Sequence, residues 1–164
     1  MVYHKNKELM ALTCKLLNID TLDFLIDFEI EARRTEGEIF TEDFDPQGFK
    51  TQTEAALNNP LFQSAHCLIC FDEDKIIGRL DFSWVPSFAF GGDLQVYVDW
   101  IYVLKAHRHQ GVAQKLFSHM ETYIIAKGFI SYFLLMAENP EAQKFYTSLA
   151  GTDISTSQVL KKYF

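Results

Sequence analysis

Residues 98–117 read VDWIYVLKAHRHQGVAQKLF, and the spacing of apolar side chains changes within this stretch. Up to residue 104 the chain is rich in β-branched and aromatic residues, so we expect one long strand over residues 94–104. From Gly111 onward the apolar residues recur with helical spacing, which predicts a helix over residues 111–128 that ends at Gly128. The apolar positions of that helix are Val112, Ala113, Leu116, Phe117, Met120, Tyr123 and Ile124.

The turn between this strand and this helix has the features of an anion site. A helix start has free backbone N–H groups, and the helix dipole favours negative charge there. Gly111 allows close backbone approach, Ala113 leaves the first turn unobstructed, and Arg108 adds a positive charge. The turn therefore predicts a phosphate or pyrophosphate site, with a plain β–α turn as the alternative. The sequence motifs of P-loops and of Rossmann dinucleotide sites are absent from the chain.

The rest of the chain has the pattern of a single mixed α/β domain, residues 1–164, without repeats or long linkers. We expect the order β-α-α-β-β-β-α-β-α-β and a mixed, mostly antiparallel sheet with helices on both faces. The other strands are predicted at residues 11–18, 65–71, 76–85, 129–136 and 158–164, and the other helices at residues 20–34, 49–59 and 139–151.

Charge and composition restrict the classes of partner. The formal net charge is −7, and residues 20–50 contain ten acidic against three basic residues. A chain without a strongly basic face argues against a nucleic-acid partner. No apolar run is long enough to cross a bilayer and the first residues do not resemble a signal peptide, so we expect a cytoplasmic protein without a membrane partner.

The cysteines and histidines give no metal signal. Cys67 and Cys70 are three apart in an expected strand, so they face opposite sides, and no second pair accompanies them. His107 and His109 have no carboxylate close to them in the sequence. We therefore expect core cysteines and no metal.

Two motifs carry a resemblance to a known family. Val103, Arg108, Gly111 and Ala113 fit the pattern V-x-P-x-x-[QR]-x-x-G-x-[GA], with Lys105 where proline is usual. A second stretch, NPEAQKFYTSLAG at residues 139–151, fits N-x-x-A-x-x-F-Y-x-x-L-G with the glycine displaced to Gly151. Together the motifs resemble those of the Gcn5-related N-acetyltransferase (GNAT) family.

The resemblance implies the GNAT fold over essentially the whole chain and an N-acetyltransferase that uses acetyl-coenzyme A (acetyl-CoA). It implies that the turn amides hold the pyrophosphate, that strand amides hold the thioester carbonyl, and that Tyr146 gives its proton to the coenzyme A thiolate. The cofactor-binding residues that it implies are Ile101, Tyr102, Val103, Arg108, His109, Gln110, Gly111, Val112, Ala113, Asn139 and Tyr146.

The general base and the acceptor are less sharply indicated. Asp99, two residues from Tyr97 on the same face of the long strand, is the expected base, and Asp81 is the alternative. The acids of residues 36–45, interleaved with phenylalanines, suggest a cationic acceptor such as a polyamine, an aminoglycoside or a basic peptide, although a solvated acidic loop explains them equally well. A non-catalytic coenzyme A sensor is the alternative function, and both a monomer and a homodimer remain open.

Overall fold

The computed structural model describes residues 12–88, 92–156, 158 and 160–163, and the chain forms two compact units, Met1–Leu134 and Leu135–Phe164. The first unit has a sheet with helices, and the second has one α-helix among its described residues. The elements of the first unit are β1 (Thr13–Leu16), η1 (Ile19–Thr21), α1 (Leu22–Thr35), α2 (Pro46–Leu57), η2 (Pro60–Phe62), β2 (Ala65–Asp72), β3 (Lys75–Ser87), β4 (Asp93–Val103), η4 (Lys105–His107), α3 (Val112–Ala126) and β5 (Phe133–Leu134). The helix of the second unit is α4 (Pro140–Ser148).

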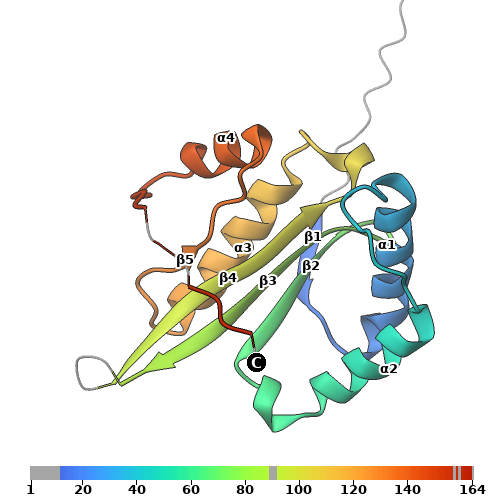
Figure 1. The fold of residues 1–164 in the computed structure, drawn as a ribbon, viewed down its shortest axis with the longest axis horizontal. Coiled ribbons are helices and arrows are strands. Elements are labelled where there is room, and N and C mark those ends of the chain that lie inside the picture. The colour runs from blue at the N-terminus through green and yellow to red at the C-terminus, as the bar shows by residue number, and fades with distance from the viewer. Residues whose placement is uncertain (1–11, 89–91, 157, 159, 164) are drawn as a thin grey trace, which may run out of the picture. The chain divides into compact units, whose positions relative to one another are not determined.

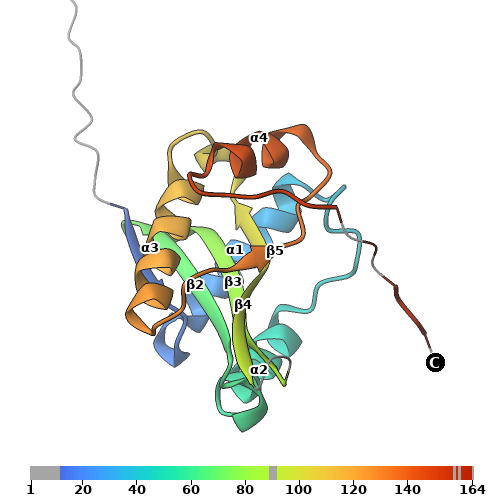
Figure 2. The same cartoon turned by 90° about the vertical axis from the view of Figure 1, so that its left-hand side faces the viewer.

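The sheet has the order β1-β2-β3-β4-β5. The first three pairings are antiparallel, and β4 and β5 are parallel. In Figures 1 and 2, α1 and α2 lie on one face of the sheet and α3 lies on the other. These findings confirm the predicted mixed, mostly antiparallel sheet with helices on both faces.

The ends of the chain differ from the expectation. The predicted strand at residues 158–164 is wrong for its described residues, 158 and 160–163, which form no strand. Residues 159 and 164 lie outside the described part, as does residue 11 of the first predicted strand. The strand predicted at residues 129–136 is reduced to Phe133–Leu134. A β-rich composition yields a strand only where a neighbouring strand is paired with it, and composition alone does not reveal that partner.

Local sequence explains where the helices begin. Asn18 and Thr21 form a capping box at η1, directly before α1. The Asp45 carboxylate accepts a hydrogen bond from the Gln47 N–H at 3.1 Å, and Pro46 is the first residue of α2. Side chains therefore satisfy free backbone donors at η1, the turn that leads into α1, and at the start of α2.

Gly78 of β3 allows α3 to lie close against the sheet. A Cβ atom at this position would be 2.7 Å from Val112 Cγ1 and 3.1 Å from Leu116 Cδ1. Val112 and Leu116 are both buried. The first two turns of α3 are therefore held directly over β3, which fixes the position of the turn that precedes α3.

His66 of β2 lies in an aromatic cluster on the same side of the sheet as α3. Its ring stacks on Phe82 at 5.0 Å between centroids and lies 4.4 Å from Trp84 and 5.7 Å from Tyr123. Burial lowers the pKa of His66, and the positive charge of Lys127 lowers it further, although a hydrogen bond with the Ser64 carbonyl opposes both. The folded protein therefore favours the neutral imidazole.

No helix in the described residues combines the length and the apolar character needed to cross a bilayer.

We expect Gly78→Ala to lower the free energy of unfolding by about 1–3 kcal/mol, because the new methyl group overpacks the contact with α3. Urea unfolding followed by circular dichroism measures this loss. Gly37→Ala is the matched control, because its Cβ would meet only the Arg33 carbonyl oxygen at 3.4 Å, an ordinary contact. Equal stabilities of the two variants would contradict the close approach at Gly78.

We expect the wild-type protein to lose stability relative to His66→Phe as the pH falls below about 6.5, the ordinary value for histidine. The folded pKa is lower than the unfolded one, so the unfolded chain takes up the proton first and is favoured by acid. The difference stops growing once the pH is below the folded pKa. Urea unfolding of both proteins from pH 8 to pH 5 measures it, and parallel curves would refute the buried neutral histidine.

Candidate active site

The turn between β4 and α3 presents backbone N–H groups. Gly111 has φ +81° and His109 has φ +59°, so the backbone turns sharply just before α3. The first hydrogen bond of the helix runs from the Lys115 N–H to the Gly111 carbonyl at 2.9 Å, so the amides of residues 112–114 precede it. A Cβ atom on Gly111 would meet nothing within 4 Å. The helix start is therefore open and suited to an anion.

The Arg108 side chain is held by Glu36, at the C-terminal end of α1. One guanidinium nitrogen lies 3.0 Å from Glu36 Oε1, a second forms an ion pair with Oε2, and Nε donates to the Val103 carbonyl at 3.1 Å. The Tyr102 hydroxyl also donates to Glu36. In the sequence, Glu36 is one of the acids of residues 36–45 that suggested a cationic acceptor, and no local signal links it to an arginine 72 positions away.

The environment of Glu36 favours its charged form. Glu36 is only 4% exposed. Burial alone would raise its pKa, but the hydrogen bonds from Arg108 and Tyr102 and the charge of Arg108 outweigh burial and lower it. Burial and the hydrogen bond to Glu36 raise the pKa of Tyr102, so its phenol remains the donor. The three groups form one satisfied network in which Glu36 and Tyr102 are buried and Arg108 is partly exposed.

One edge of β4 presents amides beyond the end of its pairing with β5. The Leu104 N–H donates to the Ile77 carbonyl at 2.9 Å, and antiparallel hydrogen bonds alternate along a strand. The Tyr102 amide therefore faces β3, whereas the Ile101 and Val103 amides face the opposite edge. On that edge, within the described residues, β5 pairs only with Tyr97 and Val98. The Ile101 and Val103 amides are thus placed to receive a ligand.

Asp99 occupies a β-bulge of β4. Asp81 is opposite Trp100 and Phe82 is opposite Val98, so Asp99 is the extra residue. A bulge bends the strand and turns the side chain away from the regular alternation. Asp99 is exposed, and its carboxylate has no hydrogen bond or ion pair within the part of the chain that the structure describes.

A cavity of about 790 Å³ lies on the face of the sheet that α1 and α2 cover, and residues of both helices and of the sheet line it. Tyr97, Asp99 and Asp81 all line it, so the structure places the expected base and its alternative in one cavity. The rest of its wall is mostly apolar and includes Leu25, Phe49 and Phe62. The cavity therefore combines an apolar wall with a small number of ionisable groups, which is typical of a small-molecule site.

The two carboxylates of the cavity differ in their partners. Arg79 Nε donates to both Asp81 oxygens at 3.0 Å, and Arg79 also forms an ion pair with the buried Glu29 at 2.6 Å. Asp81 is therefore already neutralised by an arginine. Asp99 is the carboxylate in this cavity that remains available to an incoming group.

The loop after α1 does not supply acids to this cavity. None of the acids in residues 36–45 lines it. The rings of Phe40 and Phe44 instead face the Arg33 guanidinium, at 4.8 Å and 4.0 Å from their centroids. The acidic groups of the cavity, Asp81 and Asp99, come from strands. Phe40 and Phe44 of the loop contact Arg33 instead of the cavity.

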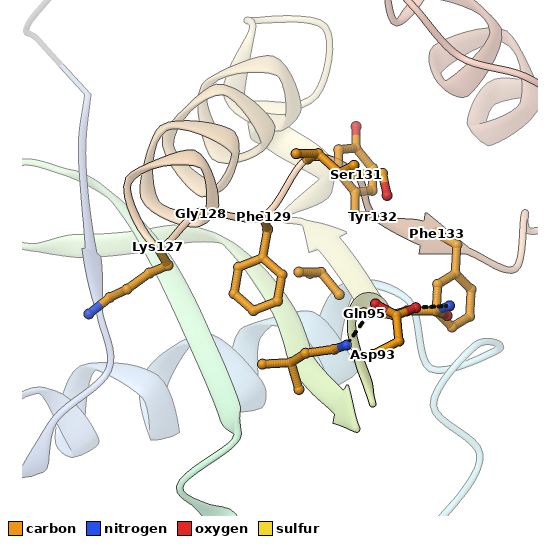
Figure 3. Close-up of a pocket in the computed structure, with 11 residues that line it drawn as sticks. Asp93, Gln95, Lys127, Gly128, Phe129, Ser131, Tyr132 and Phe133 are labelled. Atoms are coloured by element: carbon orange, nitrogen blue, oxygen red, sulfur yellow. Dashed lines mark hydrogen bonds between the residues drawn. The ribbon is translucent and has the colours of Figure 1, made fainter. Parts of the chain in front are cut away.

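A second cavity, of about 690 Å³, lies between the start of β4 and the segment that joins α3 to β5 (Figure 3). Its polar groups include Asp93 and Gln95, which hydrogen-bond to each other at 3.0 Å. None of the predicted site residues lines it.

The two predicted site residues of the second unit lie on and before α4. The Asn139 side chain accepts a hydrogen bond from the Ala142 N–H at 2.8 Å and so caps the helix, with Pro140 in the first helical position. Tyr146 is half-buried beside Phe145, and burial raises the pKa of its phenol. Their roles with the cofactor stay predictions.

Among the described residues, no three histidine, cysteine or acidic side chains are grouped closely enough to hold a metal ion.

The Acetyltransferase (GNAT) family model matches residues 29–151, which is more than half of the chain. No curated protein gives a significant match. The first of three similar solved structures is an aminoglycoside acetyltransferase from an uncultured soil metagenomic sample in complex with sisomicin, with 20% identity, a TM-score of 0.68, and coverage of 93% of this chain and 95% of that chain. The second is a ribosomal-protein-alanine N-acetyltransferase from Brucella melitensis biovar Abortus 2308, with 19% identity, a TM-score of 0.69, and coverage of 93% and 99%.

The third, a transcriptional regulator from Bacillus halodurans C-125, has 15% identity, a TM-score of 0.74, and coverage of 94% of this chain and 100% of that chain. At these identities the likeness shows the fold, and the family model carries the assignment. The chain therefore belongs to the Acetyltransferase (GNAT) family and is an acetyl-CoA-dependent N-acetyltransferase.

Proposed function

We propose that this protein transfers the acetyl group of acetyl-CoA to a primary amine of a small, cationic acceptor, and that residues 1–164 act as one acetyltransferase domain. The observation that carries the proposal is the arrangement along β4. Three features follow one another along β4 and into the turn after it. They are the unpaired carboxylate of Asp99, the outward amides of Ile101 and Val103, and the open turn at Gly111.

The residues of the turn fit a pyrophosphate. The amides of Gly111, Val112 and Ala113 would bind its oxygens, with His109 and Gln110 beside them, because a helix start favours anions. The left-handed φ of Gly111 and the open space at its Cα support this fit. Asn139 is a further candidate for a cofactor contact on the family motif.

The β4 edge suits the thioester carbonyl. Amides that are fixed in a sheet are oriented before the reaction, so they stabilise the negative charge that develops on a carbonyl oxygen. The hydrogen-bond alternation favours Ile101 and Val103 for this role over Tyr102, whose amide faces β3.

Asp99 is proposed to accept the proton of the acceptor amine, directly or through water. Its exposed position on the bulge of β4 supports this role, whereas Asp81 is held by Arg79. Tyr146 is proposed to donate a proton to the departing thiolate. A phenol whose pKa is raised by burial stays protonated at neutral pH, and its ordinary value of about 10 suits a thiolate leaving group.

The acceptor is proposed to be a cationic amine of the polyamine or aminoglycoside type, with a basic peptide as the other candidate. The unpaired Asp99 in a mostly apolar cavity supports a positively charged guest. Two of the similar structures are described as an aminoglycoside acetyltransferase and as a ribosomal-protein-alanine N-acetyltransferase, which supports both kinds of acceptor.

The deciding experiment measures thiol release from acetyl-CoA across polyamines, aminoglycosides, amino acids and basic peptides, together with calorimetric binding of coenzyme A. We expect binding of coenzyme A and turnover with at least one cationic amine. Turnover confined to neutral or acidic amines would overturn the acceptor proposal. Binding without turnover would favour the non-catalytic sensor, and absence of binding would refute the cofactor turn.

We expect Asp99→Asn to lower kcat/KM for the amine about 100-fold near pH 7, because a positioned base contributes roughly that factor. The loss should shrink as the pH rises and the free amine becomes abundant in solution. Asp81→Asn is the matched control, with lower stability and a much smaller kinetic loss, because that carboxylate is neutralised by Arg79. A larger kinetic loss in Asp81→Asn would assign the base to Asp81.

A further inference from the structure

We infer that Glu36 is a positioning residue for the cofactor turn: its buried carboxylate holds Arg108 and thereby sets the backbone of residues 104–111. The phosphates are bound by the turn amides, and the Arg108 guanidinium acts within the protein. This inference rests on the proposed binding of acetyl-CoA at the turn.

The Arg108 guanidinium is hydrogen-bonded within the protein. All three nitrogens of the guanidinium have partners, two on Glu36 and one on the Val103 carbonyl. Val103 ends β4, and Arg108 follows η4, so the Nε contact closes the loop of backbone between them. The side chain therefore bridges the end of the strand, the turn and α1.

The charges of Glu36 and Arg108 balance each other. A buried carboxylate is stable only if it is paired and hydrogen-bonded. Glu36 obtains the Arg108 charge and the Tyr102 hydroxyl. Because Glu36 offsets the charge of Arg108, this arginine offers little net attraction to a phosphate nearby.

The position of Glu36 is itself fixed. Its N–H donates to the Ala32 carbonyl at 3.0 Å, and its own carbonyl accepts hydrogen bonds from Ile39 at 3.0 Å and Phe40 at 3.3 Å. Ala32 and Phe28 of α1 are buried in the core. The Glu36–Arg108 pair thus links the turn to α1, which is packed on the sheet. The contact at Gly78 holds the start of α3.

A row of four stacked side chains on the α1 side of the sheet supplies an internal comparison. Arg108 lies 5.5 Å from the Tyr102 ring, Tyr102 stacks on Trp100 at 5.6 Å with an interplanar angle of 5°, and Arg79 lies 5.2 Å from the Trp100 ring. Glu36 pairs with the arginine at one end of this row, and Glu29 pairs with the arginine at the other. Both glutamates are almost fully buried, and Glu29 also forms an ion pair with Arg33, so Glu29 serves as a buried, arginine-paired control.

The test compares Glu36→Gln with Glu29→Gln. We expect Glu36→Gln to raise both the Kd of coenzyme A and the KM of acetyl-CoA about 10- to 100-fold, as displaced positioning groups do, while kcat falls far less. Glu29→Gln should lose stability to a similar degree but keep the affinity for coenzyme A. Calorimetry, steady-state kinetics and urea unfolding provide the three readouts.

Arg108→Gln separates this inference from direct phosphate binding by Arg108. If Arg108 only holds the turn, Arg108→Gln and Glu36→Gln weaken coenzyme A binding alike, and the double variant is no weaker than either single one. If Arg108 binds phosphate, Glu36→Gln frees it and strengthens binding, which would overturn the inference. Tyr102→Phe keeps the ion pair and provides a milder variant, expected to weaken binding in the same direction.

The outcomes distinguish this inference from the proposed function. A wild-type protein that does not bind coenzyme A overturns the proposed function and this inference with it. A wild-type protein that binds coenzyme A, together with unchanged affinity in Glu36→Gln and Tyr102→Phe, overturns the role of Glu36 alone.

Discussion

The close approach of α3 to β3 at Gly78 is the contact on which the candidate site depends. The Cβ atom of any other residue would meet Val112 and Leu116 and push the helix start away from the sheet. The turn at Gly111 lies directly before Val112, so this contact also determines where its amides point. The buried pair of Glu36 and Arg108 holds the other side of the same turn. A small residue in a strand and a largely buried ion pair therefore orient the proposed anion site together.

β4 connects the two halves of the proposed chemistry. Its pairing with β5 ends at Val98, after which the outward amides of Ile101 and Val103 face an edge without a neighbouring strand in the described chain. Its bulge turns Asp99 towards a cavity whose other carboxylate, Asp81, is neutralised by Arg79. In the proposed mechanism, a single strand thus supplies both the amides that stabilise the carbonyl and the carboxylate that accepts the proton. On this proposal, side-chain identity matters at residue 99 and backbone geometry matters at residues 101 and 103.

The network beneath the cavity shows how a chain of net charge −7 accommodates buried acids. Glu36 is paired with Arg108, and Glu29 is paired with Arg79 and Arg33. Arg108 and Arg79 lie at the ends of a stack formed by Trp100 and Tyr102. Removal of one partner would leave a buried charge, which is far costlier than the pair itself. The acids of the first half of the chain therefore serve partly as structural counter-charges, and Asp99 is left for a ligand.

The sequence by itself determined most of the sheet-forming strands, the change from strand to helix at Gly111 and the family motifs, because periodicity and turn chemistry are local properties. Only the tertiary structure decided the partner of Arg108, the neutralisation of Asp81, the use of Phe40 and Phe44 by Arg33, and the lack of a strand in the described residues of 158–164. These features join residues that are far apart in the chain or require a neighbouring strand. The physical reason is that a charge or a strand edge is satisfied by whatever the fold brings next to it, and no local pattern records that neighbour.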